Sequence, residues 1–173
     1  MTVPRFFRGP SRPIWIAMAA CLLSACAEYL GTSFSEIVPP EMAGGEAVPG
    51  AHCVLEMING TRSEKIWHAS RNHRIVFYGW ALNSARASAA AWLIVRLRSV
   101  AGDRKSYYAV TWARGPRDDV GRVYGPGPGI AIAAFDLTGT LQQVPPGTYD
   151  IDIVVSGQGG PESCSTERQL AVT

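Results

Sequence analysis

The stretch AWLIVRLRS, residues 91–99, has the clearest β-strand pattern in the chain. Apolar and polar residues alternate in it with a period of two, which is typical of a strand with one buried face. The face expected to contact a core is aliphatic: Leu93, Val95 and Leu97. The opposite face carries aromatic, aliphatic and basic side chains: Trp92, Ile94, Arg96 and Arg98.

The same period continues on both sides of this strand. After the turn AGD at 101–103, the stretch RKSYYAVTWA at 104–113 is expected to return as the second strand of a hairpin. Further β-branched and aromatic runs, separated by turns rich in Gly and Pro, lie at 53–58, 64–68, 74–82, 130–137, 148–156 and 164–172. We find no convincing helical stretch, and the pattern predicts an all-β fold, an antiparallel β-sandwich of about 7–9 strands. In the run 148–156, Asp150 and Asp152 are expected on the solvated face.

The N-terminus has the layout of a secretory signal peptide. Arginines without acids precede an apolar run from Ile14 to Leu23, and the small residues Ser24 and Ala25 follow it. A membrane-spanning helix needs roughly 20 apolar residues, so this run is too short to be one.

Leu23-Ser24-Ala25-Cys26 resembles the bacterial lipobox, in which small residues precede a cysteine that becomes lipidated. The resemblance implies cleavage before Cys26, acylation of this residue, and anchoring of the chain in a membrane. Ala27, rather than Asp, at the second mature position implies sorting to the outer membrane. The alternative is ordinary cleavage after Ala27 at the motif Ala25-Cys26-Ala27; we favour the lipobox because its residues directly follow the apolar run.

The segment 26–50 interrupts any long element with Pro39-Pro40, Gly44-Gly45 and Pro49-Gly50. We therefore expect a signal peptide at 1–25, a lipidated N-terminus and linker at 26–50, and the β-sandwich at 51–173. A flexible linker of this length would reach about 25–30 Å from the lipid. Part of it could instead be ordered, because five of its residues are apolar enough to dock on another surface: Tyr29, Leu30, Phe34, Ile37 and Val38.

The charge balance gives no sign of a nucleic-acid partner. Residues 1–25 hold three of the 16 basic residues and none of the 14 acidic ones, so the mature chain carries a net charge of −1 instead of +2. Basic residues gather between Arg62 and Arg122, and acidic residues predominate on both sides. Either the two ends fold back and neutralise this middle part, which we favour, or it presents a basic face to an anionic polymer.

Two cysteines remain beyond Cys26, and they stand near the start and the end of the predicted sandwich. In a secreted protein, such a pair predicts a disulfide, here between Cys53 and Cys164. Two free, buried thiols are the alternative.

The part of the chain from 74 to 156 resembles an Ig-like β-sandwich module of bacterial envelope proteins. The similarity lies in GWAL at 79–82, RDDV at 117–120, AAFDL at 133–137 and PPGTYDIDIVV at 145–155, with Ala134 and Asp118 standing where Gly and Pro are usual. This resemblance implies an accessory, non-catalytic domain. In RDDV we expect a loop latch in which an arginine pairs with an aspartate; the candidates are Arg114, Arg117, Asp118 and Asp119.

No catalytic constellation is evident, and we expect neither a metal nor another cofactor. The histidines His52, His68 and His73 lack helical metal-ligand spacing, and the common nucleophile and phosphate-loop motifs are missing from the sequence. An enzyme of unrecognised type is the weakest of three interpretations. The first is an outer-membrane-anchored binding or structural module, and the second is a lipid-anchored subunit that docks a periplasmic protein through an edge strand.

A candidate binding face lies on the outer side of the 91–113 hairpin. If its strands pair, aromatic rings and arginines share one surface: Trp92, Arg96, Arg98, Tyr108 and Trp112. Rings can stack on sugars, and arginines bind carboxylates or phosphates. This combination favours an anionic envelope glycan as ligand, while a packing surface is the alternative.

We predict that replacing Cys26 with Ser abolishes fatty-acid labelling and releases the protein from the membrane fraction, because the thiol is the expected acylation point. Metabolic labelling with palmitate and fractionation measure both effects. A variant that still incorporates label and sediments with membranes would contradict the lipobox interpretation.

Overall fold

The structure is a computed structural model that describes residues 32–62, 64–85, 90–125 and 130–173. The predicted signal peptide and the predicted lipidation site, Cys26, lie outside the described residues. No helix in these four segments is long and apolar enough to cross a membrane.

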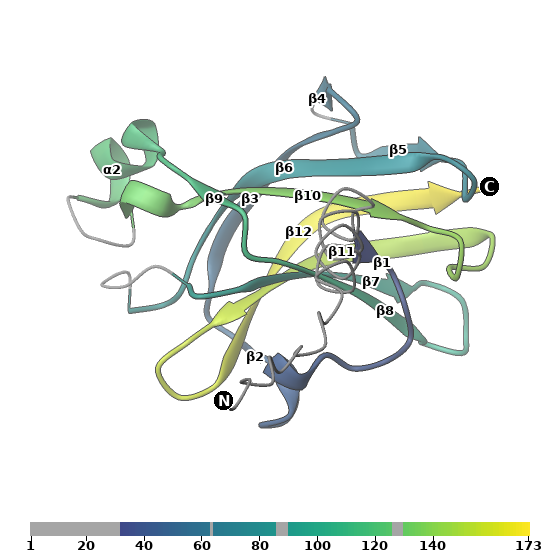
Figure 1. The fold of residues 1–173 in the computed structure, drawn as a ribbon, viewed down its shortest axis with the longest axis horizontal. Helices are drawn as coiled ribbons and strands as arrows, with labels where there is room; N and C mark the ends of the chain where they lie inside the picture. The colour runs from purple at the N-terminus through teal and green to yellow at the C-terminus, as the bar shows by residue number, and fades with distance from the viewer. Residues whose placement is uncertain (1–31, 63, 86–89, 126–129) are drawn as a thin grey trace, which may run out of the picture. The chain divides into compact units, whose positions relative to one another are not determined.

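Two β-sheets pack face to face and form a sandwich (Figure 1). The first sheet has the order β1-β10-β6-β3-β4, with β9 beside β10; its strands are β1 (Thr32–Ser33), β3 (His52–Ile58), β4 (Thr61–Arg62), β6 (Arg74–Leu82), β9 (Arg114–Gly115) and β10 (Ala134–Thr140). The second has the order β2-β12-β11-β7-β8, with β5 beside β12; its strands are β2 (Val48–Pro49), β5 (Ile66–Ala69), β7 (Leu93–Ser99), β8 (Ser106–Thr111), β11 (Gly147–Ser156) and β12 (Pro161–Val172). The predicted all-β sandwich is confirmed.

The long strands are arranged as in an Ig-like sandwich whose fourth strand lies beside the third instead of in the sheet of the first, second and fifth. Taken along the chain, the first, second and fifth long strands form one sheet, and the third, fourth, sixth and seventh form the other. Near the start of β11, the Tyr149 hydroxyl donates a hydrogen bond to the Pro145 carbonyl at 2.8 Å, as in the tyrosine corner of such folds. The long pairs are antiparallel, but both sheets are mixed because β1, β2 and β5 run parallel to their neighbours.

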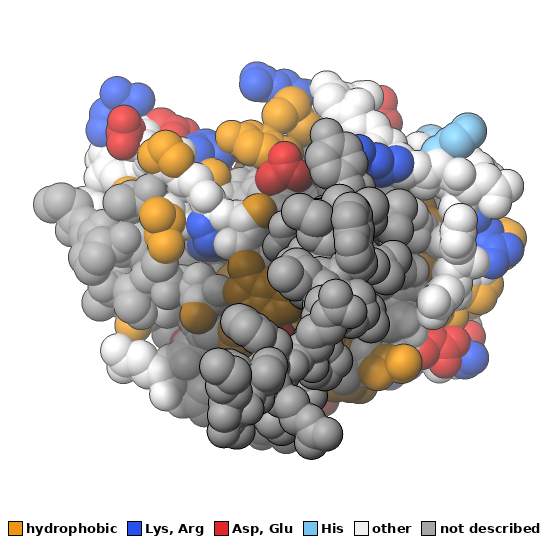
Figure 2. All heavy atoms as spheres, viewed as in Figure 1, with side chains coloured by type: hydrophobic (Ala, Val, Ile, Leu, Met, Phe, Trp, Pro, Cys, Tyr) orange, Lys and Arg blue, Asp and Glu red, His pale blue; other side chains and the backbone are white. Residues whose placement is uncertain are grey.

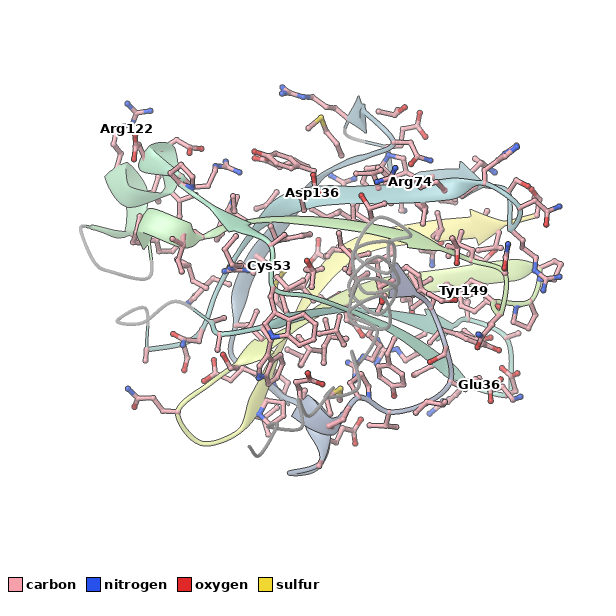
Figure 3. All side chains as sticks on the ribbon, viewed as in Figure 1. Glu36, Cys53, Arg74, Arg122, Asp136 and Tyr149 are labelled. Carbon is pink, nitrogen blue, oxygen red and sulfur yellow. A yellow bond between two sulfur atoms is a disulfide. The ribbon has the colours of Figure 1, made fainter. Side chains whose placement is uncertain are left out.

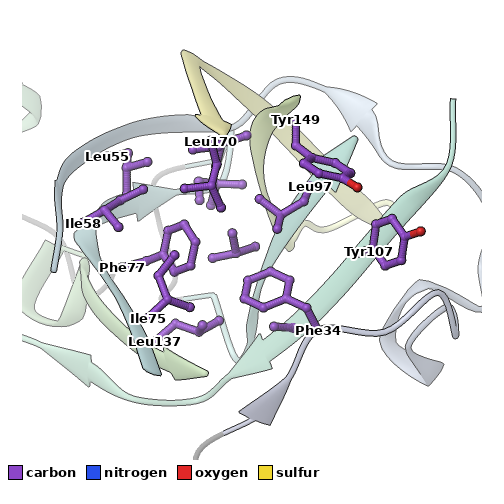
Figure 4. Packing of buried hydrophobic residues seen from close by; sticks show 14 of the residues in the cluster. Phe34, Leu55, Ile58, Ile75, Phe77, Leu97, Tyr107, Leu137, Tyr149 and Leu170 are labelled. Carbon is purple, nitrogen blue, oxygen red and sulfur yellow. The ribbon is translucent and has the colours of Figure 1, made fainter. Parts of the chain in front are cut away.

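The core lies between the sheets, and the alternation within the strands fills it. Leu93, Val95 and Leu97 point into it from β7 as predicted, and so do the alternate residues of β11. Figure 4 shows the aromatic and aliphatic side chains that meet there from both sheets.

The segment 32–49, which we call the strap, belongs to the sandwich. β1 pairs with the end of β10, and the side chain of Phe34 is fully buried between the sheets (Figure 4). Ser35 then exchanges two backbone hydrogen bonds with Tyr108 on β8, at 3.1 and 2.8 Å. The strap continues through the 3-10 helix η1 (Pro40–Met42) to β2 at the opposite edge of the second sheet.

Residues 32–49 of the expected linker 26–50 are therefore part of the sandwich, and residues 26–31 lie outside the described residues. Gly139 makes the close approach of β1 feasible, because a Cβ atom there would lie 2.7 Å from the Thr32 carbonyl oxygen. The glycines and prolines that predict a linker instead allow the strap to bend around the second sheet.

A second difference concerns the predicted loop 114–129. It contains a short helix, α2 (Asp118–Tyr124), whose Val120 packs with Trp80 and Leu82 on the outer side of the first sheet. The 3-10 helix η2 (Ile130–Ile132) follows and supplies Ile130 to the same cluster. The sequence pattern does not predict this helix, because two glycines and the flanking prolines interrupt any helical period around its contact residues Val120 and Tyr124.

The predicted disulfide is present. Cys53 on β3 and Cys164 on β12 are bonded, with Cα atoms 6.0 Å apart, and the bridge joins the two sheets across 111 positions of sequence.

We predict that the double variant Cys53→Ser with Cys164→Ser loses about 2–5 kcal/mol of unfolding free energy, because the bridge restricts the unfolded chain over a long loop. Urea denaturation measures the change, and reduction of the wild-type protein is the matched control. Alkylation of two thiols in native protein without reductant would contradict the bridge.

Candidate functional site: the outer face of the second sheet

The register of β7, β8 and β11 arranges the predicted face in rows. Arg96 lies opposite Tyr108 on one side and Asp152 on the other, and Arg98 lies opposite Ser106 and Asp150. Because Leu93 pairs with Thr111, Trp92 and Trp112 flank the pair at the far end of the hairpin. The structure thus brings four of the five predicted residues, Trp92, Arg96, Arg98 and Tyr108, to the outer face of the second sheet, and Trp112 lies just beyond the end of β8.

The strap divides this face. Its residues Met42 and Ala47 form a buried cluster with Ile94 and Val154, the row between the tryptophans and the arginines. Trp92 packs against this cluster, while Trp112 remains 62% exposed. The predicted face is therefore divided into an aromatic surface and a basic surface, because Met42 and Ala47 cover the Ile94–Val154 row that lies between them.

Asp152 lies under the basic surface, and its predicted solvent exposure is wrong. It is 2% exposed, and its Oδ2 accepts hydrogen bonds from Arg96 Nε at 3.2 Å and Nη2 at 2.9 Å. Arg98 Nη2 lies 3.4 Å from the same oxygen. The alternation along β11 is as expected, but the neighbouring arginines and the strap cover its outer face.

Next to this ion pair, the strap and the β7–β8 hairpin border an open hollow of about 640 Å³. The strap contributes mainly apolar side chains and one acid: Val38, Met42, Ala43 and Glu46. The hairpin contributes guanidinium and hydroxyl groups: Arg96, Arg98, Arg104, Ser106 and Tyr108. Arg104 and Glu46 are missing from the sequence-predicted site, since only the fold of the strap brings them together.

Acids from outside the basic middle form ion pairs with four of its basic residues: Arg96, Arg98, Lys105 and Arg117. Besides the Asp152 pairs, Glu36 binds Lys105 at 3.1 Å and Glu56 binds Arg117 at 2.8 Å. On the face viewed in Figure 2, basic and acidic side chains accordingly lie next to each other at the upper left and at the lower right.

Glu36 fixes the strap to β8. Its Oε1 accepts hydrogen bonds from Lys105 Nζ and from the Tyr107 hydroxyl, at the end of the sandwich that also carries Tyr149 (Figure 3). These bonds hold the pKa of Glu36 below its usual value. Burial and the bond to Glu36 raise the pKa of Tyr107 to about 12.

The predicted loop latch forms around Arg117. This side chain donates to Asp119 at 2.8 Å through Nε and to both carboxylate oxygens of Glu56 at 2.8 and 3.0 Å. The bond from Arg117 holds the pKa of Asp119 well below its usual range. Arg114 instead donates to the carbonyls of Ile132 and Ala81, and burial lowers its pKa to about 10; Asp118 stays exposed at the start of α2. The latch ties α2 to β3.

The described residues contain no group of three or more His, Cys, Asp or Glu side chains arranged to hold a metal ion. In comparisons with known proteins, no family model, curated protein or solved structure matches the chain. The chemistry of the basic surface therefore follows from the side chains that form it.

We predict that Asp152→Asn lowers the free energy of unfolding by about 3–5 kcal/mol, because it leaves the buried Arg96 without a counter-charge. Chemical denaturation followed by tryptophan fluorescence measures the loss. Asp150→Asn is the matched control and should cost about 1 kcal/mol or less, since this half-buried neighbour accepts one side-chain bond from the described residues, that of Gln169. Equal losses in the two variants would show that Asp152 is not the central counter-charge.

Proposed function

We propose that the protein is a lipid-anchored, non-catalytic binding module of the bacterial cell envelope. The lipobox-like residues before Cys26 support the anchor. The Cys53–Cys164 bridge fits an oxidising compartment outside the cytoplasm. The Ig-like strand order fits an accessory domain, although such a fold by itself assigns no function.

The observation that carries the proposal is the position of the strap relative to Cys26. Thr32, the first described residue and one that pairs with Gly139 in the first sheet, comes six positions after this cysteine. Six residues span at most about 22 Å even when fully extended. A lipid on Cys26 would hold the sandwich close to the membrane surface, nearer than the 25–30 Å that a flexible linker up to residue 50 would allow.

A second candidate function is docking of a periplasmic protein, and one observation favours it. β8 is the outermost strand of its sheet, and the strap pairs with it at Tyr108. Just beyond the end of β8 stands Trp112, whose large ring is mostly exposed. The strap occupies this edge at Tyr108, and the part of β8 between Tyr108 and the exposed aromatic ring suits the addition of a short extended peptide.

We predict that the mature protein starts at an acylated Cys26 and fractionates with the outer membrane, and that Ala27→Asp moves it to the inner membrane. Density-gradient fractionation in a Gram-negative host that sorts by the second mature residue measures the location, and intact mass identifies the N-terminus. Ala27→Ser is the matched control and should stay with the outer membrane. A soluble mature chain beginning at Glu28 would contradict the anchor.

A further inference from the structure

We infer that the hollow between the strap and the β7–β8 hairpin binds an acidic sugar, a hexose-sized ring that carries a carboxylate or a phosphate. The inference rests on the proposed function for the source of the ligand, the glycans of the envelope. The site itself is built from side chains of the folded domain, so it can be tested on purified protein independently of the anchor.

Two guanidinium groups in the hollow are available to an anion. Arg96 makes both of the short bonds to Asp152, so Arg98 interacts with it only at 3.4 Å and keeps a side chain that is 44% exposed. Arg104 is exposed and forms no ion pair with any described residue. Guanidinium groups bind carboxylates and phosphates through short, charge-assisted hydrogen bonds.

The backbone holds Arg104 at the rim of the hollow. Its φ of 48° lies in the left-handed region, which is uncommon for residues other than glycine. The turn of the hairpin fixes this conformation, since the Arg104 amide donates to the Ala101 carbonyl at 3.2 Å. A side chain that starts from a fixed backbone loses less freedom on binding.

Glu46 makes the hollow better suited to a sugar acid than to a simple anion. It stands on the strap side, and its carboxylate can accept hydrogen bonds from hydroxyl groups. Because Asp152 cancels Arg96, the remaining charges are Arg98 and Arg104 against Glu46, a net charge of +1. This balance favours a ligand with one acidic group and several hydroxyls.

The remaining walls suit the ring of such a ligand. Met42 and Val38 present aliphatic surface, and Tyr108 presents a partly exposed aromatic ring with a hydroxyl group. Surfaces of this kind pack against the carbon-bound hydrogens of a sugar while leaving its hydroxyls to polar partners. The volume of about 640 Å³ lies within the range of about 300–1,000 Å³ typical of small-molecule sites.

The test is calorimetric titration of the mature protein in detergent with glucuronate, glucose 1-phosphate, inorganic phosphate and glucose. We expect both sugar acids to bind, more weakly as salt rises, and glucose not to bind measurably. Arg98→Gln and Arg104→Gln should each weaken sugar-acid binding about tenfold or more, since each removes a charge-assisted bond. Arg74→Gln, which alters an exposed arginine on the other sheet, is the matched control and should change nothing.

Two further variants separate the parts of the inference. Glu46→Gln should weaken both sugar acids relative to inorganic phosphate. It replaces the carboxylate that accepts from the sugar hydroxyls with a weaker, neutral acceptor, whereas the loss of its negative charge favours all three anions alike. Ala43→Trp should block the hollow while leaving both arginines in place.

Three results would overturn the inference. One is that neither sugar acid binds at millimolar concentration, and another is that binding survives both arginine substitutions or the Ala43→Trp substitution. The third is that the sugar acids bind no tighter than inorganic phosphate and that their affinity does not change in Glu46→Gln. If the protein fails these tests but carries lipid on Cys26, the sugar-acid site is refuted and the proposed function is not. A protein that passes them without lipid would leave the site standing.

Discussion

Burial of the Phe34 side chain between the two sheets is the constraint on which the rest of the molecule depends. It fixes the position of the residues on either side of Phe34, so that β1 pairs with β10 and Ser35 pairs with Tyr108 on β8. A fully buried aromatic side chain stabilises a fold by about 1.5–3 kcal/mol relative to an exposed one. The strap is thereby part of the sandwich, and it sets both the length of the tether and the shape of the outer face.

The strap also changes what the outer face can do. By covering Ile94 and Val154 with Met42, it separates the tryptophans from the arginines and forms one wall of a hollow beside the latter. Asp152 then distinguishes the two arginines: its short hydrogen bonds hold Arg96 in the structure, and the more weakly paired Arg98 remains available to a ligand. Arg96 is buried and lies 2.9 Å from the Asp152 carboxylate, whereas Arg98 lies 3.4 Å from it and is partly exposed.

Local pattern was enough to predict the strands, the inward faces of β7 and β11, and the pairing of Cys53 with Cys164, because each depends on alternation or on the number of cysteines. The strap could not be predicted in this way. Phe34 stands in a stretch rich in Gly and Pro, and its role depends on a cavity formed by strands far along the chain. Asp152 was placed on the correct face, but its burial results from tertiary packing. The arginine hollow was only half predictable, since Arg104 and Glu46 reach it through the strap and the hairpin turn.

Native-state hydrogen exchange of the strap amides tests this account most directly. The Phe34 and Ser35 amides donate to the carbonyls of Thr140 and Tyr108, both at 3.1 Å, inside the sandwich. The account predicts that these amides exchange as slowly as those of β7, because opening them requires the core to open. Exchange of both amides at the rate of an unstructured chain would show that the strap is a flexible linker, and it would remove the basis for the short tether and for the hollow.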